Sequence, residues 1–274
     1  MRRNLLPMQK SGFLLLLLFA LVGCDNFGKV LKSSDTDYKI ERATSYMENG
    51  KYANALTLYE NVFPLVRGTN KGEEVYFKLA ECNYKLNDFY SASYYYGAFE
   101  KTFPKSDLAE KAAFLSAYCA YSTSPEFDLD QGDTQQAIES LQLFKLKYPQ
   151  SPLLDSTQSL IQELLYKLEI KRFETAKTYH RTRRYRSASI AFANMIKDFP
   201  NTSFDEELYF LMFQSNFELA VNSVVGKKME RLEEAKKSYY NFVDLFPDSD
   251  RIKEVENQFK KVNTELEKLE KLNS

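Results

Sequence analysis

Five alanines stand at intervals along the chain, and large apolar residues follow each of them at helical spacing. They are Ala55, Ala92, Ala137, Ala188 and Ala235. A proline lies twelve residues after each of the last four, directly behind an aromatic residue: Phe103-Pro104, Tyr148-Pro149, Phe199-Pro200 and Phe246-Pro247. Self-similarity with a period of a few tens of residues is typical of stacked repeat units. We therefore expect a repeat protein whose function depends on its partners.

The residues between each alanine and its proline form one face of a helix. After Ala92 the series runs Tyr96, Phe99 and Phe103, in steps of four, three and four, and the next three repeats keep these steps. Proline cannot continue a helix and disfavours helical geometry in the residue before it, so it ends each unit. The hydroxyl residues two places later are expected to cap the next helix: Ser106, Ser151, Thr202 and Ser249.

A first helix is expected before each of these helices, because Ala43, Ala80 and Ala176 lie twelve residues upstream of Ala55, Ala92 and Ala188. This spacing resembles the tetratricopeptide repeat over roughly residues 38–250. The resemblance implies an all-α solenoid of about five helix-turn-helix units, with repeats 1–3 in residues 38–150 and repeats 4–5 in 151–250.

Residues 251–274 carry an apolar stripe at helical spacing. It consists of Ile252, Val255, Phe259, Val262, Leu266 and Leu269. Because the end of a solenoid needs a helix that is polar outside, this segment is expected to be a C-terminal capping helix. A coiled-coil seam is the alternative, although the stripe is under three heptads long.

The N-terminus has the pattern of a secretory signal peptide. Arg2, Arg3 and Lys10 precede an apolar run from Phe13 to Val22, which is about half as long as a membrane-spanning helix. Residues 1–23 are therefore predicted to be cleaved. Cys24, directly after Gly23, resembles the lipidation site of a lipobox, which implies diacylation of Cys24 and a polar tether over 24–37. An ordinary signal peptide with a chance cysteine is the alternative.

The composition argues against nucleic-acid binding and catalysis. Without residues 1–23 the chain has 37 − 3 = 34 basic and 38 acidic residues, and so lacks the basic excess of a nucleic-acid surface. His180 is the only histidine, and no phosphate-binding glycine loop is present. We expect no enzyme, no cofactor and no metal.

Two weaker motifs have plain structural interpretations. Asp128–Asp133 is similar to a calcium loop, but Asp133 stands where that loop needs glycine, so Asp133-Thr134 is expected to cap the helix of Ala137. Cys82 and Cys119 each follow a first-helix alanine by two residues and are expected to be buried free thiols. A disulfide between them is the alternative.

A cluster of arginines is the strongest electrostatic feature of the mature chain. It comprises Arg181, Arg183, Arg184 and Arg186 and lies at the expected turn of the fourth repeat. A helix C-terminus attracts one or two cations through its dipole. The excess predicts a surface for a partner or for lipid headgroups.

A lipidated array of about five repeats resembles the BamD family of outer-membrane assembly lipoproteins. Local matches are the acidic insertion at 128–138, the repeat end at 144–152 and the start of the fourth repeat at 174–188. The resemblance implies a non-enzymatic, lipid-anchored protein on the periplasmic face of the outer membrane. It implies that the C-terminal repeats hold a POTRA domain of the barrel protein BamA, and that the N-terminal repeats receive unfolded barrel proteins.

Carried onto this chain, the resemblance implies a substrate-peptide site on the concave face near Tyr46, Asn83 and Tyr84. It places BamA contact near the arginine cluster and along the fifth repeat and the C-terminal tail. The chain has Ala191 and Phe192 where the family often carries a basic residue, and Asp25 follows the lipidated cysteine, where in some bacteria it retains a lipoprotein at the inner membrane.

Two other functions fit a lipoprotein built of helical repeats. One is a pilotin or scaffold for pilus or secretin assembly. The other is a carbohydrate-uptake lipoprotein of the SusD type, although those proteins are about twice as long and contain a further binding region.

Overall fold

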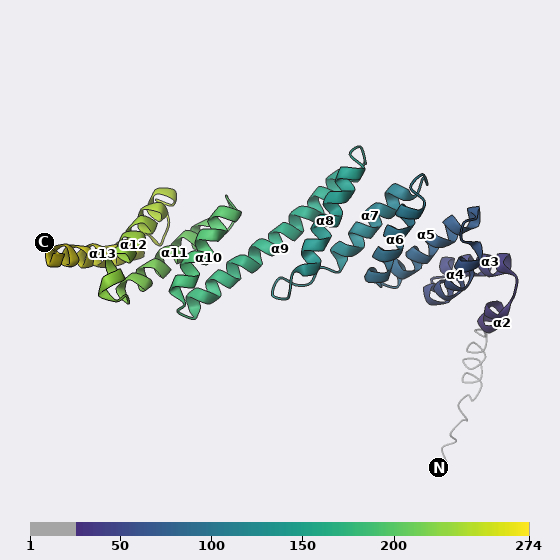
Figure 1. Ribbon diagram of the computed structural model, residues 1–274, viewed down its shortest axis with the longest axis horizontal. Helices are drawn as coiled ribbons and strands as arrows, with labels where there is room; N and C mark the ends of the chain where they lie inside the picture. The colour runs from purple at the N-terminus through teal and green to yellow at the C-terminus, as the bar shows by residue number, and fades with distance from the viewer. Residues whose placement is uncertain (1–25, 274) are drawn as a thin grey trace, which may run out of the picture. The chain divides into compact units, whose positions relative to one another are not determined.

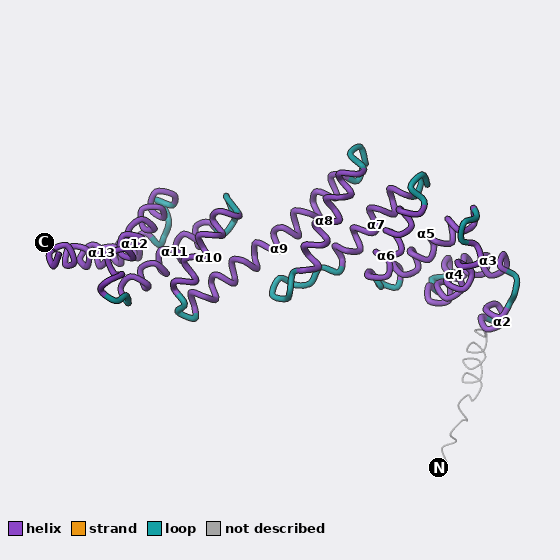
Figure 2. Tube along the Cα trace, in the orientation of Figure 1, coloured by secondary structure: helices purple, strands orange, loops and turns teal. Residues whose placement is uncertain are grey.

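The computed structural model describes residues 26–273, and all the regular elements in this range are α-helices (Figures 1 and 2). The predicted signal peptide, Cys24 and Asp25 lie outside the described residues. A short helix, α2 (Phe27–Lys32), comes first. It falls inside the segment expected to be a tether, yet it packs against the first repeat, because Val30 is buried and Phe27 lies against Tyr46.

Five helix pairs follow α2, and a single helix ends the chain. The pairs are α3 (Thr36–Glu48) with α4 (Tyr52–Val66), α5 (Asn70–Lys85) with α6 (Phe89–Thr102), α7 (Ala109–Ser122) with α8 (Gly132–Lys147), α9 (Leu154–Arg181) with α10 (Tyr185–Asp198), and α11 (Asp205–Val221) with α12 (Val225–Leu245). The last helix is α13 (Ile252–Asn273). The prediction of an all-α tetratricopeptide-repeat fold is confirmed.

The described chain divides into two compact units. The N-terminal unit extends to Thr123 and includes Leu143–Ser151, and the C-terminal unit comprises Ser124–Gln142 and the chain from Pro152 onward. The unit boundary crosses α8, whose last turns pack in the N-terminal unit through Phe144 against Phe114. Each unit has its own core.

The alanines and aromatic residues of the repeat pattern form the core of the N-terminal unit. Ala43, Ala55 and Ala92 are fully buried, and small side chains at these positions allow neighbouring helices to approach closely. Phe99 is fully buried as well and lies 5.3 Å from Phe77, ring centroid to centroid, with the two rings nearly perpendicular. The sequence register therefore corresponds to the packed face.

The C-terminal unit repeats this arrangement and ends in α13. Ala188, Phe192 and Ala235 are fully buried. The apolar stripe of α13 faces α11 and α12, since Val255 and Val262 are fully buried in the same cluster as Phe213 and Phe242. Phe259 stacks on Tyr239 with ring centroids 3.8 Å apart. The stripe is thus covered from within the same chain, as a capping helix requires.

Three of the tight turns between paired helices place a left-handed residue at the same position. Gly50, Asn87 and Arg183 each lie two residues before the second helix of their pair, with φ of 70°, 60° and 59°. Glycine adopts this conformation freely and asparagine tolerates it, whereas a side chain such as arginine costs about 1–2 kcal/mol there. Arg183 is therefore a strained member of the arginine cluster.

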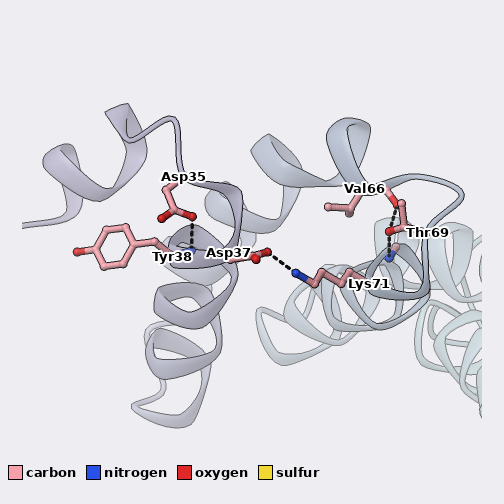
Figure 3. Close-up of polar contacts among 7 residues, drawn as sticks. Asp35, Asp37, Tyr38, Val66, Thr69 and Lys71 are labelled. Atoms are coloured by element: carbon pink, nitrogen blue, oxygen red, sulfur yellow. Dashed lines mark hydrogen bonds and ion pairs between the residues drawn. The ribbon is translucent and has the colours of Figure 1, made fainter.

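Side-chain caps and an ion pair fix the starts of the first two repeats (Figure 3). The carboxylate of Asp35 accepts a hydrogen bond from the backbone N–H of Tyr38 at 3.0 Å, and Thr69 caps α5 in the same way. Lys71 of α5 bonds to Asp37 of α3 at 2.5 Å. The contact joins the first helices of adjacent repeats.

The hydroxyl residues after the prolines were expected to cap the following helices, but they do not cap them directly. Ser106, Thr202 and Ser249 accept a hydrogen bond from the N–H of the residue just before the helix. These three hydroxyls and that of Ser151 also each donate to a glutamate on the first helix of their own repeat. The four pairs are Ser106–Glu73, Ser151–Glu110, Thr202–Glu169 and Ser249–Glu206. The hydroxyl therefore links the end of a repeat to its first helix.

Candidate functional site

The described residues hold no cluster of histidine, cysteine, aspartate or glutamate that could bind a metal ion. His180 is half-buried, and its Nδ1 lies 2.9 Å from Oγ of Ser215, which itself donates to the carbonyl of Leu211. Nδ1–H is therefore the donor, and burial lowers the pKa of His180. This histidine is packed between helices, so the candidate sites that remain are surfaces.

Two of the three residues predicted to bind a substrate peptide lie in the core. Tyr46 is 3% exposed, with Phe27 of α2 against one edge and the cations of Arg42 and Lys51 over its ring. Asn83 is 4% exposed, and its side chain donates to the carbonyl of Leu79 in the preceding turn. Neither side chain is presented to a peptide, because neighbouring segments cover both.

Tyr84, the third of these residues, lies at a half-buried surface with other aromatic side chains. It contacts Tyr118 of α7, with ring centroids 6.4 Å apart, and Tyr118 stacks in turn with Phe114 and Tyr121 of the same helix. We call Tyr84, Phe114, Tyr118 and Tyr121 the aromatic ladder. Its members lie on α5 and α7, the first helices of repeats 2 and 3.

The ladder could have been found in the sequence. Phe114, Tyr118 and Tyr121 are spaced by four and three residues, which places them on one helical face. Partly exposed aromatic rings supply large, rigid contact areas, and the tyrosine hydroxyl remains available for hydrogen bonds. A surface of this kind is suited to an extended peptide with alternating apolar side chains.

A second surface of the N-terminal unit is a hollow of about 710 Å³ between α4, α5 and α6. Its wall includes Phe63 and Tyr76, with ring centroids 4.5 Å apart, and Tyr94, which is 70% exposed. Arg67 and Glu60 add one charge of each sign. Sequence reasoning missed this hollow, because its residues come from three helices and the turn at Gly68.

The arginine cluster lies at the turn between α9 and α10, as predicted. All four of its side chains are exposed. Arg181 donates to Thr178 Oγ1 on its own helix, and no carboxylate of the described chain forms an ion pair with any of the four. The cluster therefore presents uncompensated positive charge.

The acidic insertion between α7 and α8 forms a loop that two lysines of α9 hold in place. Lys167 donates to Ser124, and Lys171 donates to the carbonyls of Asp128 and Leu129. The expected cap at Asp133-Thr134 is wrong, because α8 already begins at Gly132. Thr134 is buried and donates instead to the side chain of Gln131, the residue before the helix.

A hollow of about 520 Å³ lies beside this loop in the C-terminal unit. α9 contributes Leu165 and Leu168, α10 contributes Ala191, and Phe199 follows directly after α10. Phe192, the neighbour of Ala191, is fully buried. Ala191 thus lines a hollow of mixed character, whose wall also contains Lys171 and Arg172, whereas Phe192 lies in the core.

Cys82 and Cys119 are free and buried, as expected. Burial raises the pKa of each thiol to about 12. Thiols of this kind remain protonated and serve as small apolar core residues.

Together these features define a helical-repeat protein whose candidate sites are partner-binding surfaces. Residues 34–232 match the sequence model of the YfiO family, described as outer membrane lipoprotein. The chain belongs to this family. Among the described residues, no helix is long and apolar enough to cross a bilayer.

A curated relative is the outer membrane protein assembly factor BamD of Haemophilus influenzae. It is 20% identical over 227 residues, which are 79% of this chain and 87% of the relative.

Two solved structures of repeat proteins are also similar. A TPR repeats protein from Bacteroides fragilis has a TM-score of 0.41 and 12% identity, over 85% of this chain and 99% of its own. TPR-like repeats of a Podospora anserina kinesin light chain have a TM-score of 0.32 and 16% identity, over 74% of this chain and 93% of their own. The fold assignment rests on the helix pairs of this chain itself.

Proposed function

We propose that the chain is a non-enzymatic scaffold for the assembly of β-barrel proteins in the outer membrane. Membership of the outer membrane lipoprotein family carries the proposal, and the similarity to an assembly factor specifies it. Repeat arrays bind their partners along extended surfaces, and both units present such surfaces. Each unit binds a different partner.

The N-terminal unit receives unfolded barrel proteins on the aromatic ladder. A barrel strand alternates apolar and polar side chains, so an extended strand can place every second side chain against a row of rings. The ladder includes Tyr84, the one predicted substrate residue with an accessible surface. We therefore assign the substrate site to the ladder and no longer to Tyr46 and Asn83, because the side chains of these two residues are covered.

Binding of a barrel-strand peptide to the purified protein tests this assignment. Tyr118→Ala is expected to weaken binding about tenfold, since truncating a central aromatic contact costs more than about 1 kcal/mol. Tyr240→Ala, at a 47% exposed tyrosine of the C-terminal unit, is the matched control and should bind normally. Equal affinity of wild type and Tyr118→Ala would show that the aromatic ladder does not bind the peptide.

The C-terminal unit holds a POTRA domain of a BamA-like barrel protein through the arginine cluster. Four exposed arginines without carboxylate partners suit the edge of an acidic or hydrogen-bonding domain, because guanidinium groups bind carboxylates in a bidentate manner. Arg183→Glu with Arg184→Glu should abolish binding to the isolated POTRA domains. Lys85→Glu with Lys101→Glu makes the same charge change on exposed lysines of the N-terminal unit and should not. Intact binding by the arginine variant would exclude this contact.

The protein is anchored by acyl chains on Cys24 to the periplasmic face of the outer membrane. The family description supports the location, and the sequence around Cys24 supports the anchor. Incorporation of labelled palmitate into wild type and not into Cys24→Ser is the expected result. Recovery of the labelled protein in the inner-membrane fraction would contradict the outer-membrane location.

A pilotin or scaffold of a pilus or secretin machine is the second candidate function. The same fold and anchor would serve it, so only the identity of the bound barrel protein separates the two.

A further inference from the structure

The corner between α11 and α12 exposes two consecutive apolar residues. Val224 is 72% exposed and Val225 is 77% exposed. Val224 has extended backbone geometry and Val225 begins α12, so both stand at the tip of the corner. Single exposed apolar side chains are ordinary, but an adjacent pair at the tip of a turn presents a small apolar projection to its surroundings.

A basic hollow of about 520 Å³ adjoins this corner. Its wall is formed by Val221, Lys228, Lys260, Lys261, Thr264, Glu265 and Lys268. Four lysines and one glutamate leave three uncompensated positive charges. Val221 and Lys228 also connect the hollow to the valine tip, since they stand three residues on either side of Val224 and Val225 in the chain.

The lysines of the hollow have different partners. Glu265 accepts from Lys228 at 2.7 Å and from Lys268 at 2.8 Å, so one carboxylate holds two of the cations in place. Lys260 and Lys261 are exposed, and no acidic side chain of the described chain is paired with either. These two ammonium groups are therefore available to an anion from outside the protein.

We infer that the α11–α12 corner binds anionic phospholipid headgroups at a membrane surface. Val224 and Val225 enter the boundary between headgroups and acyl chains, while Lys260 and Lys261 contact the phosphates. A polybasic surface gains affinity for anionic lipids with each lysine, and apolar side chains beside it add to this affinity when they are buried in the interface.

The combination of the two features favours a membrane over a soluble anion or an acidic protein segment. Either of those would neutralise the lysines and leave both valines in water. A bilayer surface satisfies the lysines and the valines at the same time. This inference does not depend on the proposed POTRA or substrate contacts, and a chain of the outer membrane lipoprotein family has a membrane surface within reach.

Co-sedimentation with vesicles tests the inference on the whole chain from residue 24 onward, carrying Cys24→Ser so that no acyl chain contributes. Vesicles of phosphatidylcholine with about 30% anionic phosphatidylglycerol are compared with vesicles of pure phosphatidylcholine at low ionic strength. Binding to the anionic vesicles alone is expected. Lys260→Ala with Lys261→Ala should weaken it roughly 25-fold, at about fivefold for each lysine. Val224→Ser with Val225→Ser should also weaken it.

The matched control is Lys101→Ala with Lys105→Ala, which removes two exposed lysines from the N-terminal unit. It should bind like the unchanged chain. Equal loss in this control would show that only net charge matters, and it would overturn the inference. Absence of vesicle binding by the unchanged chain would also overturn the inference. Full competition by millimolar inorganic phosphate or glycerol phosphate would overturn it as well, because it would show that a soluble anion occupies the hollow.

Discussion

The hydroxyl of Ser151 donates to Oε1 of Glu110 at 2.6 Å, and this contact ties the end of the third repeat to its first helix. The same relationship recurs in the second, fourth and fifth repeats. The spacing in sequence varies from 33 to 43 residues, so the partner of each hydroxyl is set by the stacking of the two helices.

Removal of this contact should destabilise the N-terminal unit. Ser151 is 7% exposed, and a hydrogen bond to a carboxylate contributes about 1.5–3 kcal/mol. We expect Ser151→Ala to lower the free energy of unfolding by about 2 kcal/mol, measured by urea denaturation. Ser187→Ala, at an exposed serine of α10, should change it by less than about 0.5 kcal/mol. Equal stability of the two variants would show that the contact contributes little.

Gly72 should not tolerate a side chain. A Cβ there would lie 2.4 Å from the carbonyl oxygen of Val66, which belongs to the backbone and cannot move aside alone. Gly72→Ala is expected to cost about 1–3 kcal/mol, since overpacking forces backbone shifts. Gly28→Ala is the control: Gly28 is helical, with nothing within 4 Å of a Cβ, so alanine should stabilise the protein slightly. A neutral Gly72→Ala would mean that the start of α5 can shift.

Replacing Arg183 by glycine should stabilise the fold and weaken binding to the POTRA domains. Its φ of 59° is unfavourable for arginine, so Arg183→Gly is expected to raise the free energy of unfolding by about 1 kcal/mol. The same variant should bind the POTRA domains more weakly, because it removes one exposed guanidinium. Asn87→Gly, at the equivalent turn position, should change stability less, since asparagine tolerates this conformation. Calorimetry of both variants measures their stability, and titration with the POTRA domains measures their affinity. A lower stability of Arg183→Gly than of wild type would contradict the strain at this position.

Glu265 should make stability depend on pH in the acid range. Hydrogen bonds from Lys228 and Lys268 lower the pKa of Glu265 to about 2, from 4.5 in the unfolded chain. A lowered folded pKa stabilises the fold above pH 4.5, and this contribution is lost as the pH falls toward 2. Glu265→Gln should therefore be less stable than wild type at pH 7, by less than about 1 kcal/mol, because the pair is partly exposed to solvent. The difference should vanish near pH 2; a difference that persists there would have another origin.

The repeat register could be predicted from sequence because it depends on local rules. Proline ends helices, alanine permits close packing, and steps of three and four place Phe99 and its equivalents on one face. These rules predicted four of the helix ends to within about two residues. The arginine turn was predicted for the same reason, since charge and turn position are both local.

The burial of Tyr46 and Asn83 could not be predicted, because it depends on contacts that the repeat spacing does not contain. Tyr46 has the spacing of a first-helix residue, but α2 lies over it, and α2 arises from a segment that reads as a polar tether. Asn83 has a polar side chain that bonds within its own helix and so needs no solvent. Tyr94 and Arg67 line one hollow only because α4 and α6 both border α5.

Affinity purification of the tagged, full-length chain from detergent-solubilised envelope, read by mass spectrometry, identifies the partner on which the proposed assembly role depends. We expect recovery of a POTRA-bearing barrel protein at near one-to-one ratio, and its loss from the sample prepared with Arg183→Glu and Arg184→Glu. Recovery of a secretin or pilus component, with no such barrel protein, would contradict the assembly role.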